Sequence, residues 1–511
     1  MVFFPSSETE IFDIISSLKN GGSVEEIPCM FLKICKPHIS GILSRLFNTC
    51  LEKGIYPDIF KIARITPVFK KGARDLLENH RPISILSHLT KIFDRLIFNR
   101  ILSFFARYEI LSENQYGFRK NKNCELAALE LVNKIMPAIE NNLYCLSVFL
   151  DYKACFDTIS RDILITKLER YGIRGVGLKF LKSFFINRKQ YVNFGSAKSD
   201  LVNQDLGVIQ GSQIGPLFFD IYCNDLMNLL REDSYILYAD DTALVYVGAD
   251  LKELTDHVNQ KLSLISDWCK FNKLSLNPEK SEFLLVTNRK LAVHPLIKID
   301  NKVVRKVDRA RYLGILIDDH LKFHNHIELI ENKLARLCGI SFRLQNYFNR
   351  ETALNFYYSC VYSVFNYCLT VWGGVSACTS RCDRLIRLQN RIVENLFSKY
   401  VPRYDQIFKY MEILKFNDVY RFTVSVHMFR VIKLGEFPSL DRSLNLNYPN
   451  HQYETRQSDA LITPFPRIEC IRMNYKYQFC SIWNDVPLNI KESPSLSIFK
   501  KVLKQHYLDS Y

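Results

Sequence analysis

The chain has 511 residues, a length that suggests about three domains at roughly 150 residues each. Hydrophobic residues make up 48% and charged residues 24%, which is typical of globular proteins and excludes a mainly disordered chain. We find no run of about 18 apolar residues and no secretory signal, so we expect neither a membrane span nor secretion. The formal net charge of +15 favours a polyanionic partner, nucleic acid above all.

The positive charge is concentrated in two segments. Residues 61–74 contain five Lys or Arg and no acid, and residues 321–430 contain 15 basic and 8 acidic residues. Two separate basic segments fit a long ligand better than a small one.

The first hundred residues show helical spacing of apolar residues. Ile11, Ile14, Ile15 and Leu18 share one helical face, and a similar spacing follows Pro37. The stripe of apolar residues over 88–104 predicts another helix there.

The middle of the chain shows strand patterns. The apolar run 146–150 predicts a buried strand that ends at Asp151. The runs 235–238 and 243–247 are separated by Ala239, Asp240, Asp241 and Thr242, a pattern typical of a hairpin whose turn carries two carboxylates. The remaining expected elements are a helix at 252–272, strands at 274–276 and 283–286, mainly helical structure from about 325 to 435, a proline-bearing linker near 438–466, and a helix at 496–508.

The three aspartates are the candidate chemical site. A carboxylate at the end of a buried strand is costly unless it is solvated, paired or bound to a metal, and three acids at one sheet edge would repel one another. A divalent ion with oxygen ligands removes that conflict, and Mg²⁺ suits one or two Asp ligands completed by phosphate and water. The alternative is that Asp240 and Asp241 form a plain solvated turn.

Several motifs, in order, resemble the reverse transcriptase of non-LTR (LINE-type) retrotransposons, nearest to the jockey-like group. The palm-type motifs are Asp151-Tyr152-Lys153-Ala154-Cys155-Phe156-Asp157, Gly207-Val208-Ile209-Gln210-Gly211-Ser212, Tyr238-Ala239-Asp240-Asp241, Leu276-Asn277-Pro278-Glu279-Lys280 and Tyr312-Leu313-Gly314. Upstream blocks at 66–72, 79–84 and 115–119 and downstream segments at 367–373 and 483–487 resemble the same elements.

The resemblance implies an α+β right-hand polymerase fold, with fingers, a palm with an antiparallel sheet and a helical thumb, plus a mainly helical C-terminal region. Fingers and palm would span 1–320 with core motifs at about 61–316, the thumb 321–400, and the C-terminal region 401–511. The implied activity is RNA-directed DNA polymerisation by two-metal phosphoryl transfer, with an RNA template, a DNA primer or nicked target DNA, and dNTPs as partners. The resemblance also implies nuclear residence, whereas no endonuclease-like region is recognisable ahead of the polymerase motifs.

By the same resemblance, Asp151, Asp240 and Asp241 would meet in space as catalytic residues and hold two Mg²⁺ ions, with Mn²⁺ as an alternative. Phe156 would be a steric gate against a 2′-hydroxyl, and ordinary core packing is its alternative role. Asp157 is expected to be a local hydrogen-bonding or capping acid rather than a metal ligand.

Five further residues would bind the nucleotide. Gln210 and Gly211 would lie against it, since glycine permits close backbone approach, although a simple turn would also explain them. Lys70 and Arg81 would contact the triphosphate, or else belong to a solvated basic face. Lys280 would protonate the departing pyrophosphate, or else be a surface lysine.

Some residues depart from the family pattern. Ile209 stands where proline is usual, Ala154-Cys155 where Lys-Ala is usual, and Asp220 where an apolar helix residue is typical. These departures allow a copy with reduced activity. Together with the missing endonuclease-like region they keep open an alternative function, a truncated and catalytically impaired retroelement remnant that only binds RNA, against which the three aspartates and Gln210 argue. An RNA-dependent RNA polymerase is a second alternative, against which Phe156 argues.

Overall fold

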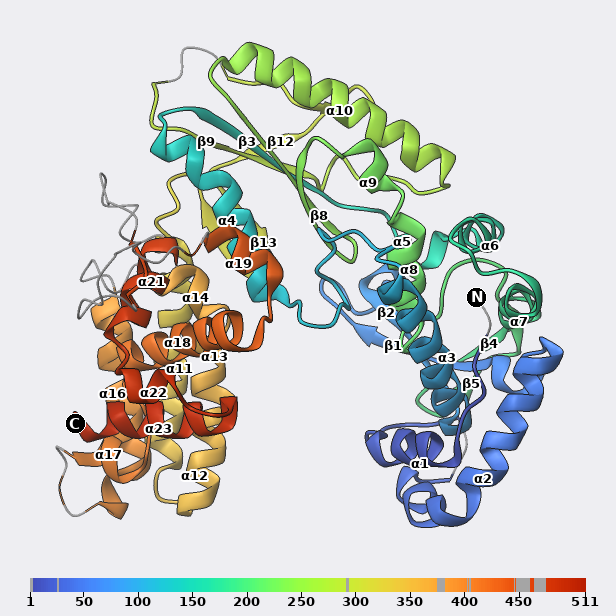
Figure 1. Ribbon diagram of the computed structural model, residues 1–511, viewed down its shortest axis with the longest axis horizontal. Coiled ribbons are helices and arrows are strands. Elements are labelled where there is room, and N and C mark those ends of the chain that lie inside the picture. Colours follow the sequence, from blue (N-terminus) through green and yellow to red (C-terminus); the bar gives the residue numbers. More distant parts are fainter. Residues whose placement is uncertain are drawn as a thin grey trace, which may run out of the picture. The chain divides into compact units, whose positions relative to one another are not determined.

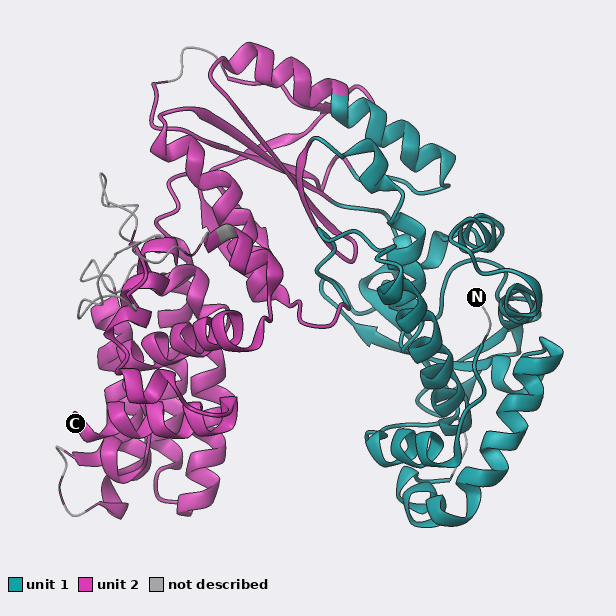
Figure 2. Cartoon of the chain, viewed as in Figure 1, with its two compact units in different colours: residues 1–118, 151–232, 261–277 teal, residues 119–150, 233–260, 278–511 magenta. Residues whose placement is uncertain are grey.

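The computed structural model describes residues 3–24, 27–290, 294–374, 382–401, 403, 406–444, 446, 460–463 and 475–511. The chain divides into two compact units (Figure 2). The first comprises residues 1–118, 151–232 and 261–277, and the second comprises 119–150, 233–260 and 278–511. Helices and sheets occur in both units, which confirms the predicted α+β class (Figure 1). None of the helices in the described part of the chain has the length and apolar character needed to cross a membrane.

The first unit is mainly helical. Its helices are α1 (Glu8–Ser17), α2 (Cys29–Lys53), α3 (His88–Arg107), α5 (Cys155–Thr158), α6 (Arg161–Arg170), α7 (Gly175–Phe185), α8 (Gly215–Cys223) and α9 (Leu226–Leu229). The predicted helix at 88–104 is confirmed as α3: Ser87 caps it by accepting from the Thr90 N–H, and the apolar stripe is buried. The two helices predicted before residue 60 are confirmed as α1 and α2.

A five-stranded sheet completes the first unit. Its strands are β1 (Ile62–Phe69), β2 (His80–Ile85), β4 (Lys189–Phe194), β5 (Ala197–Lys198) and β6 (Val202–Asn203). The order is β2-β1-β4-β5, with β6 also paired to β4. Strands β1 and β2 form an antiparallel hairpin, whereas β1 and β4 are parallel. The sheet therefore joins two segments more than a hundred residues apart in sequence.

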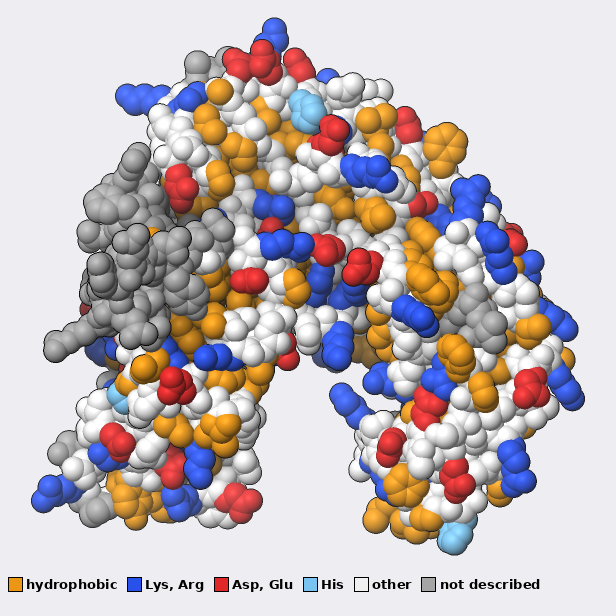
Figure 3. Space-filling model, in the orientation of Figure 1, with side chains coloured by type: hydrophobic (Ala, Val, Ile, Leu, Met, Phe, Trp, Pro, Cys, Tyr) orange, Lys and Arg blue, Asp and Glu red, His pale blue; other side chains and the backbone are white. Residues whose placement is uncertain are grey.

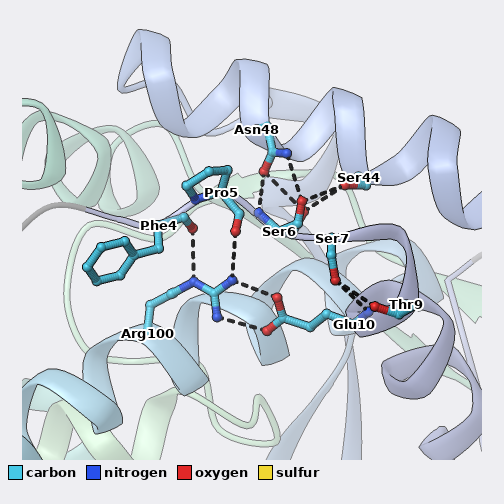
Figure 4. A network of polar contacts seen from close by, with 9 residues as sticks. All are labelled: Phe4, Pro5, Ser6, Ser7, Thr9, Glu10, Ser44, Asn48 and Arg100. Carbon is cyan, nitrogen blue, oxygen red and sulfur yellow. Dashed lines mark hydrogen bonds and ion pairs between the residues drawn. The ribbon is translucent and has the colours of Figure 1, made fainter.

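The N-terminal segment is fixed to α2 and α3 by polar contacts (Figure 4). The Arg100 guanidinium of α3 forms a two-bond ion pair with Glu10, at 2.8 and 2.6 Å, and also donates to the Phe4 carbonyl at 2.9 Å. Asn48 of α2 accepts from the Ser6 N–H at 2.7 Å and donates to the Ser6 carbonyl at 3.0 Å. Helix α1 begins directly after this segment, where Ser7 caps it by accepting from the Glu10 N–H at 3.1 Å.

The second unit contains a mixed five-stranded sheet. Its strands are β3 (Tyr144–Leu150), β7 (Ser234–Tyr238), β8 (Asp241–Gly248), β9 (Glu282–Val286) and β12 (Arg305–Val307), in the order β12-β9-β3-β8-β7. The predicted strands at 146–150 and 283–286 are confirmed. The predicted antiparallel sheet is correct for three of its pairings, but β12 and β9 are parallel. Helix α4 (Cys124–Glu140) packs against β3, β7, β8 and β9.

Two small hairpins follow this sheet. They are formed by β10 (Lys298–Ile299) with β11 (Lys302–Val303), and by β13 (Arg309–Tyr312) with β14 (Ile315–Asp318).

The rest of the described part of the second unit is mainly helical, which confirms the prediction for about 325 to 435 and the predicted helix at 496–508. Its α-helices are α11 (His324–Leu344), α12 (Arg350–Phe356), α13 (Ser363–Asn366), α14 (Leu369–Trp372), α16 (Asp383–Phe397), α17 (Ile407–Tyr410), α18 (Phe416–Leu434), α19 (Pro438–Leu444), α21 (Tyr475–Asp485), α22 (Leu488–Lys491) and α23 (Leu496–Asp509). The predicted linker near 438–466 begins instead with α19, and most of the linker's remaining residues lie outside the described part of the chain.

Helix α10 (Leu251–Phe271) confirms the predicted helix at 252–272, but the predicted strand at 274–276 is wrong. That segment makes one isolated antiparallel bridge, between Leu276 and Tyr152. A single bridge is not a strand, because the neighbouring residues of this short segment do not extend the ladder.

Candidate active site

Two strands of the second unit carry the acidic motif on their connecting turn. In the β7–β8 hairpin, Tyr238 pairs with Asp241, so Ala239 and Asp240 form a two-residue turn. Ala239 has a φ of +53°, in the left-handed region that such tight turns use. Both Asp240 and Asp241 are exposed. The predicted hairpin with carboxylates at its turn is therefore confirmed.

The central strand β3 ends beside this hairpin. Its last residue, Leu150, pairs with Thr242, the second residue of β8. The strand is buried along most of its length because it lies between β8 and β9. Asp151 is the next residue after Leu150, so the two acidic motifs follow from adjacent strand ends.

Asp151 is also bound by a neighbouring segment of the first unit. The Asn277 N–H donates to the Asp151 carbonyl at 2.8 Å, and the Asn277 side-chain amide donates to Asp151 Oδ2 at 3.2 Å. The Lys153 N–H donates to the Ser275 carbonyl at 2.9 Å. The segment predicted as a strand thus orients the acidic loop, and Asn277 is a site residue that the sequence did not single out for this role.

The described residues contain no group of three or more His, Cys, Asp or Glu side chains that could hold a metal ion. The chemistry of the available donors still fits a hard divalent cation, since carboxylate oxygens follow two adjacent strand ends. Mg²⁺ is usually held by one or two carboxylates together with substrate phosphates rather than by an all-protein cage. The described residues therefore do not hold a complete set of protein ligands by themselves.

Gln210 lies next to Asp157 in the first unit. The Gln210 Nε2 donates to Asp157 Oδ1 at 2.7 Å, which fits the local hydrogen-bonding role expected for Asp157. Burial raises the pKa of Asp157, and the hydrogen bond from Gln210 opposes that rise.

Position 211 requires glycine because two backbone segments approach each other closely there. Its φ is +103°, and a Cβ atom at this position would lie 2.7 Å from the Ser84 carbonyl oxygen of β2. The Ser84 N–H also donates to the Gln210 carbonyl at 2.8 Å. Any other residue at position 211 would push this turn away from the β1–β2 hairpin.

Phe156 packs against a helix of the same unit. Its ring stacks on Phe219 of α8, with centroids 4.6 Å apart and planes inclined by 20°. Phe219 is 1% exposed, whereas Phe156 is half-buried. One face of the Phe156 ring thus rests on the core.

Lys70 and Arg81 lie together on the β1–β2 hairpin. Arg81 pairs with Val68, and the Lys70 N–H continues the ladder by donating to the Asn79 carbonyl at 2.8 Å. Because side chains alternate along a strand, Lys70 and Arg81 share one face of the hairpin. Both are exposed, so the structure brings together the two basic residues predicted from separate motifs.

A cavity of about 220 Å³ lies on the other face of this hairpin. Pro82 and Ser84 of β2 line it, together with Asp157, Val208 and Gln210. The cavity thus adjoins the Gln210 side chain.

Lys280 lies in the second unit, two residues before β9, and is exposed. The preceding Glu279 forms a 3.5 Å ion pair with Lys302.

Sequence reasoning missed Arg161, which holds the loop before Gln210. Its guanidinium donates to the carbonyls of Gly207 at 3.0 Å, Leu206 at 3.2 Å and Phe185 at 2.8 Å, and also to that of Gln204. Burial lowers the pKa of Arg161 to about 10, so the side chain stays charged at neutral pH. A lone arginine in a helix gives no signal of such a role, since its four acceptors are backbone atoms.

Comparisons with known proteins show which proteins this chain resembles. Residues 68–317 match the family model of reverse transcriptase (RNA-dependent DNA polymerase). The chain is 28% identical over 410 residues to the probable RNA-directed DNA polymerase from transposon BS of Drosophila melanogaster, covering 76% of this chain and 44% of the relative. It is 28% identical over 366 residues to the RNA-directed DNA polymerase from mobile element jockey of the same organism, covering 69% of this chain and 39% of the relative.

The chain spans less than half the length of these two relatives. Among solved structures, telomerase from Candida albicans in complex with a fragment of telomeric RNA aligns with a TM-score of 0.40 and 12% identity, covering 73% of this chain and 68% of that one. The motifs, the family-model match over 68–317 and the relatives agree with one another: the chain is similar to the reverse transcriptases of mobile elements.

Proposed function

We propose that the protein is an RNA-directed DNA polymerase that extends a DNA 3′-OH on an RNA template, consuming dNTPs and releasing pyrophosphate. The observation that carries the proposal is the strand register. Leu150 pairs with Thr242, and a two-residue turn presents Asp240, so Asp151 and Asp240 follow from adjacent strand ends. The family match over 68–317 and the names of the relatives support the same activity.

Asp151, Asp240 and Asp241 are the proposed catalytic residues and ligands of divalent metal. Reverse transcriptases generally use divalent ions, and we propose two Mg²⁺, with Mn²⁺ as a substitute. When bound, the ions would lower the pKa of the attacking hydroxyl and neutralise the leaving pyrophosphate. Asn277 would hold the Asp151 carboxylate through its bond to Oδ2.

Several other residues are proposed to bind the nucleotide. Lys70 and Arg81 would contact the triphosphate from their shared face of the β1–β2 hairpin, where the arginine fork can form paired bonds to phosphate. Gln210 and Gly211 would lie against the nucleotide. Phe156, supported on its buried side by the core, would exclude a 2′-hydroxyl.

Lys280 is the proposed general acid for the departing pyrophosphate, a role that a positioned lysine can perform. Its exposure leaves it accessible to substrate.

The proposed domain organisation keeps fingers and palm at 1–320, thumb at 321–400 and a C-terminal region at 401–511. The helices from α11 onward support a helical thumb. The net charge of +15 supports non-specific binding to nucleic acid backbones (RNA template and DNA primer or nicked target). On the face that Figure 3 shows, Lys and Arg side chains are spread over both units among acidic ones. A nuclear location is proposed from the family.

The test is a primer-extension assay with an RNA template, a DNA primer, dNTPs and Mg²⁺. The wild type should extend the primer, and Asp240→Ala should lower the rate by at least about 100-fold, since even outer-shell changes at metal sites cost up to that factor. If the wild type and Asp240→Ala are equally inactive but both bind RNA, the remnant alternative is correct. If ribonucleotides are preferred, the protein is an RNA polymerase.

A further inference from the structure

Asp157 is placed to control the side chain of Gln210. The two residues are 53 positions apart in sequence, yet Gln210 Nε2 donates to Asp157 Oδ1 at 2.7 Å. Such a bond to a charged acceptor is shorter and stronger than one between neutral groups. Both residues line the cavity described above.

The backbone around this pair is fixed independently of the side-chain bond. The Val208 N–H donates to the Phe156 carbonyl and the Gly207 N–H donates to the Ile159 carbonyl, both at 2.9 Å. A Cβ atom at position 207 would lie 2.7 Å from the Asp157 carbonyl oxygen, so the glycine keeps the two segments in contact. Removing the Asp157 carboxylate should therefore release the Gln210 side chain without moving the main chain.

The charge of Asp157 also determines the orientation of the amide. An ionised carboxylate only accepts hydrogen bonds, so the amide nitrogen of Gln210 must face it. The carbonyl oxygen Oε1 and the second N–H of Gln210 are then directed to other partners. A neutral amide at position 157 would allow either orientation.

We propose that Asp157 is a positioning residue for polymerisation: by holding the Gln210 amide in one orientation, it sets which donor and which acceptor the incoming nucleotide meets. This inference rests on the proposed function. Asp157 does not touch the substrate in this role, and its whole effect passes through Gln210.

The experiment measures kcat and KM for dNTPs in steady-state primer extension. Asp157→Ala should raise the KM for dNTP by about 10-fold, the factor that corresponds to the loss of one hydrogen bond to a charged group, and should increase misincorporation. Asp157→Asn should give a smaller increase, because its oxygen still accepts but no longer forces one orientation. Asp162→Ala, an exposed acid on the neighbouring helix α6, is the matched control and should match the wild type.

A double-mutant cycle separates positioning from a general structural role. In a Gln210→Ala background, Asp157→Ala should cause no further loss, because residues that act as a unit are not additive. Additive losses, or wild-type KM and fidelity in Asp157→Ala, would overturn the inference. Circular dichroism checks that each variant folds. If Asp157→Ala does not fold, the kinetics of Asp157→Asn test the proposal instead. Wild-type KM and fidelity in Asp157→Asn would then reject it. An inactive wild type would instead reject the proposed function.

Discussion

Replacing Arg161 with methionine should loosen the loop that leads into Gln210. Methionine keeps an unbranched apolar stem of similar reach but removes all the donors. Arg161 is 9% exposed, and two of its four hydrogen bonds, to the Gly207 and Phe185 carbonyls, are buried. The other two are partly buried, so water can replace them.

The size of the effect follows from the two buried bonds. A hydrogen bond to a charged group contributes about 1.5 to 3 kcal/mol, so their loss should destabilise this region by about 3 to 6 kcal/mol. Arg161→Lys keeps the charge but not the planar fork, and its loss should be intermediate.

Hydrogen–deuterium exchange read by mass spectrometry localises this change. Peptides that cover residues 204–210 should exchange much faster in Arg161→Met than in the wild type, and peptides from the second unit should be unchanged. Urea unfolding followed by circular dichroism gives the accompanying loss of stability. A change below about 0.5 kcal/mol, the usual range of neutral surface substitutions, together with unaltered exchange would show that the guanidinium does not hold the loop.

Two other predictions concern buried groups of the first unit. Phe219→Leu removes the ring beneath Phe156 and should increase ribonucleotide incorporation while leaving RNA binding intact; unchanged dNTP-to-rNTP selectivity in primer extension would mean that Phe219 does not support the gate. Burial raises the pKa of Asp94 from 3.8 to about 6, so its contribution to stability is present below pH 3.8 and is lost as the pH rises through 6. Asp94→Asn still accepts the 2.8 Å hydrogen bond from Tyr56, and it should remove that pH dependence, worth up to about 3 kcal/mol at 1.36 kcal/mol per pKa unit. Unfolding curves of the two proteins from pH 4 to 7 should therefore diverge, and parallel curves would contradict this reasoning.

Local patterns predicted the elements that carry the acidic motifs. The run 146–150 and the hairpin around Asp240 were visible because a buried strand and a tight turn each impose their own sequence signal. The order of the strands could not be predicted from local patterns, because Leu150 and Thr242, which pair in the sheet, are more than ninety positions apart in the sequence.

Sequence patterns did not predict the short contacts at which two distant segments of the chain meet. The run 274–276 has the apolar alternation of a strand but forms one bridge, because its partner at Tyr152 belongs to a loop. The bonds of Asp157 to Gln210 and of Asn277 to Asp151 are equally invisible in a single sequence. Each joins a side chain to a residue that only the folded backbone brings near.

The left-handed conformation of Ala239 restricts the position directly before Asp240. A β-branched side chain there would clash with the following carbonyl oxygen, whereas glycine would adopt the same φ without strain. Variants at this position can thus abolish activity by tilting the turn, even though the side chain contributes no chemistry. Loss of activity in a variant next to an acidic motif can therefore arise from backbone strain as well as from a lost substrate contact. Inactive variants at position 239 are consequently no evidence that this residue binds metal or substrate.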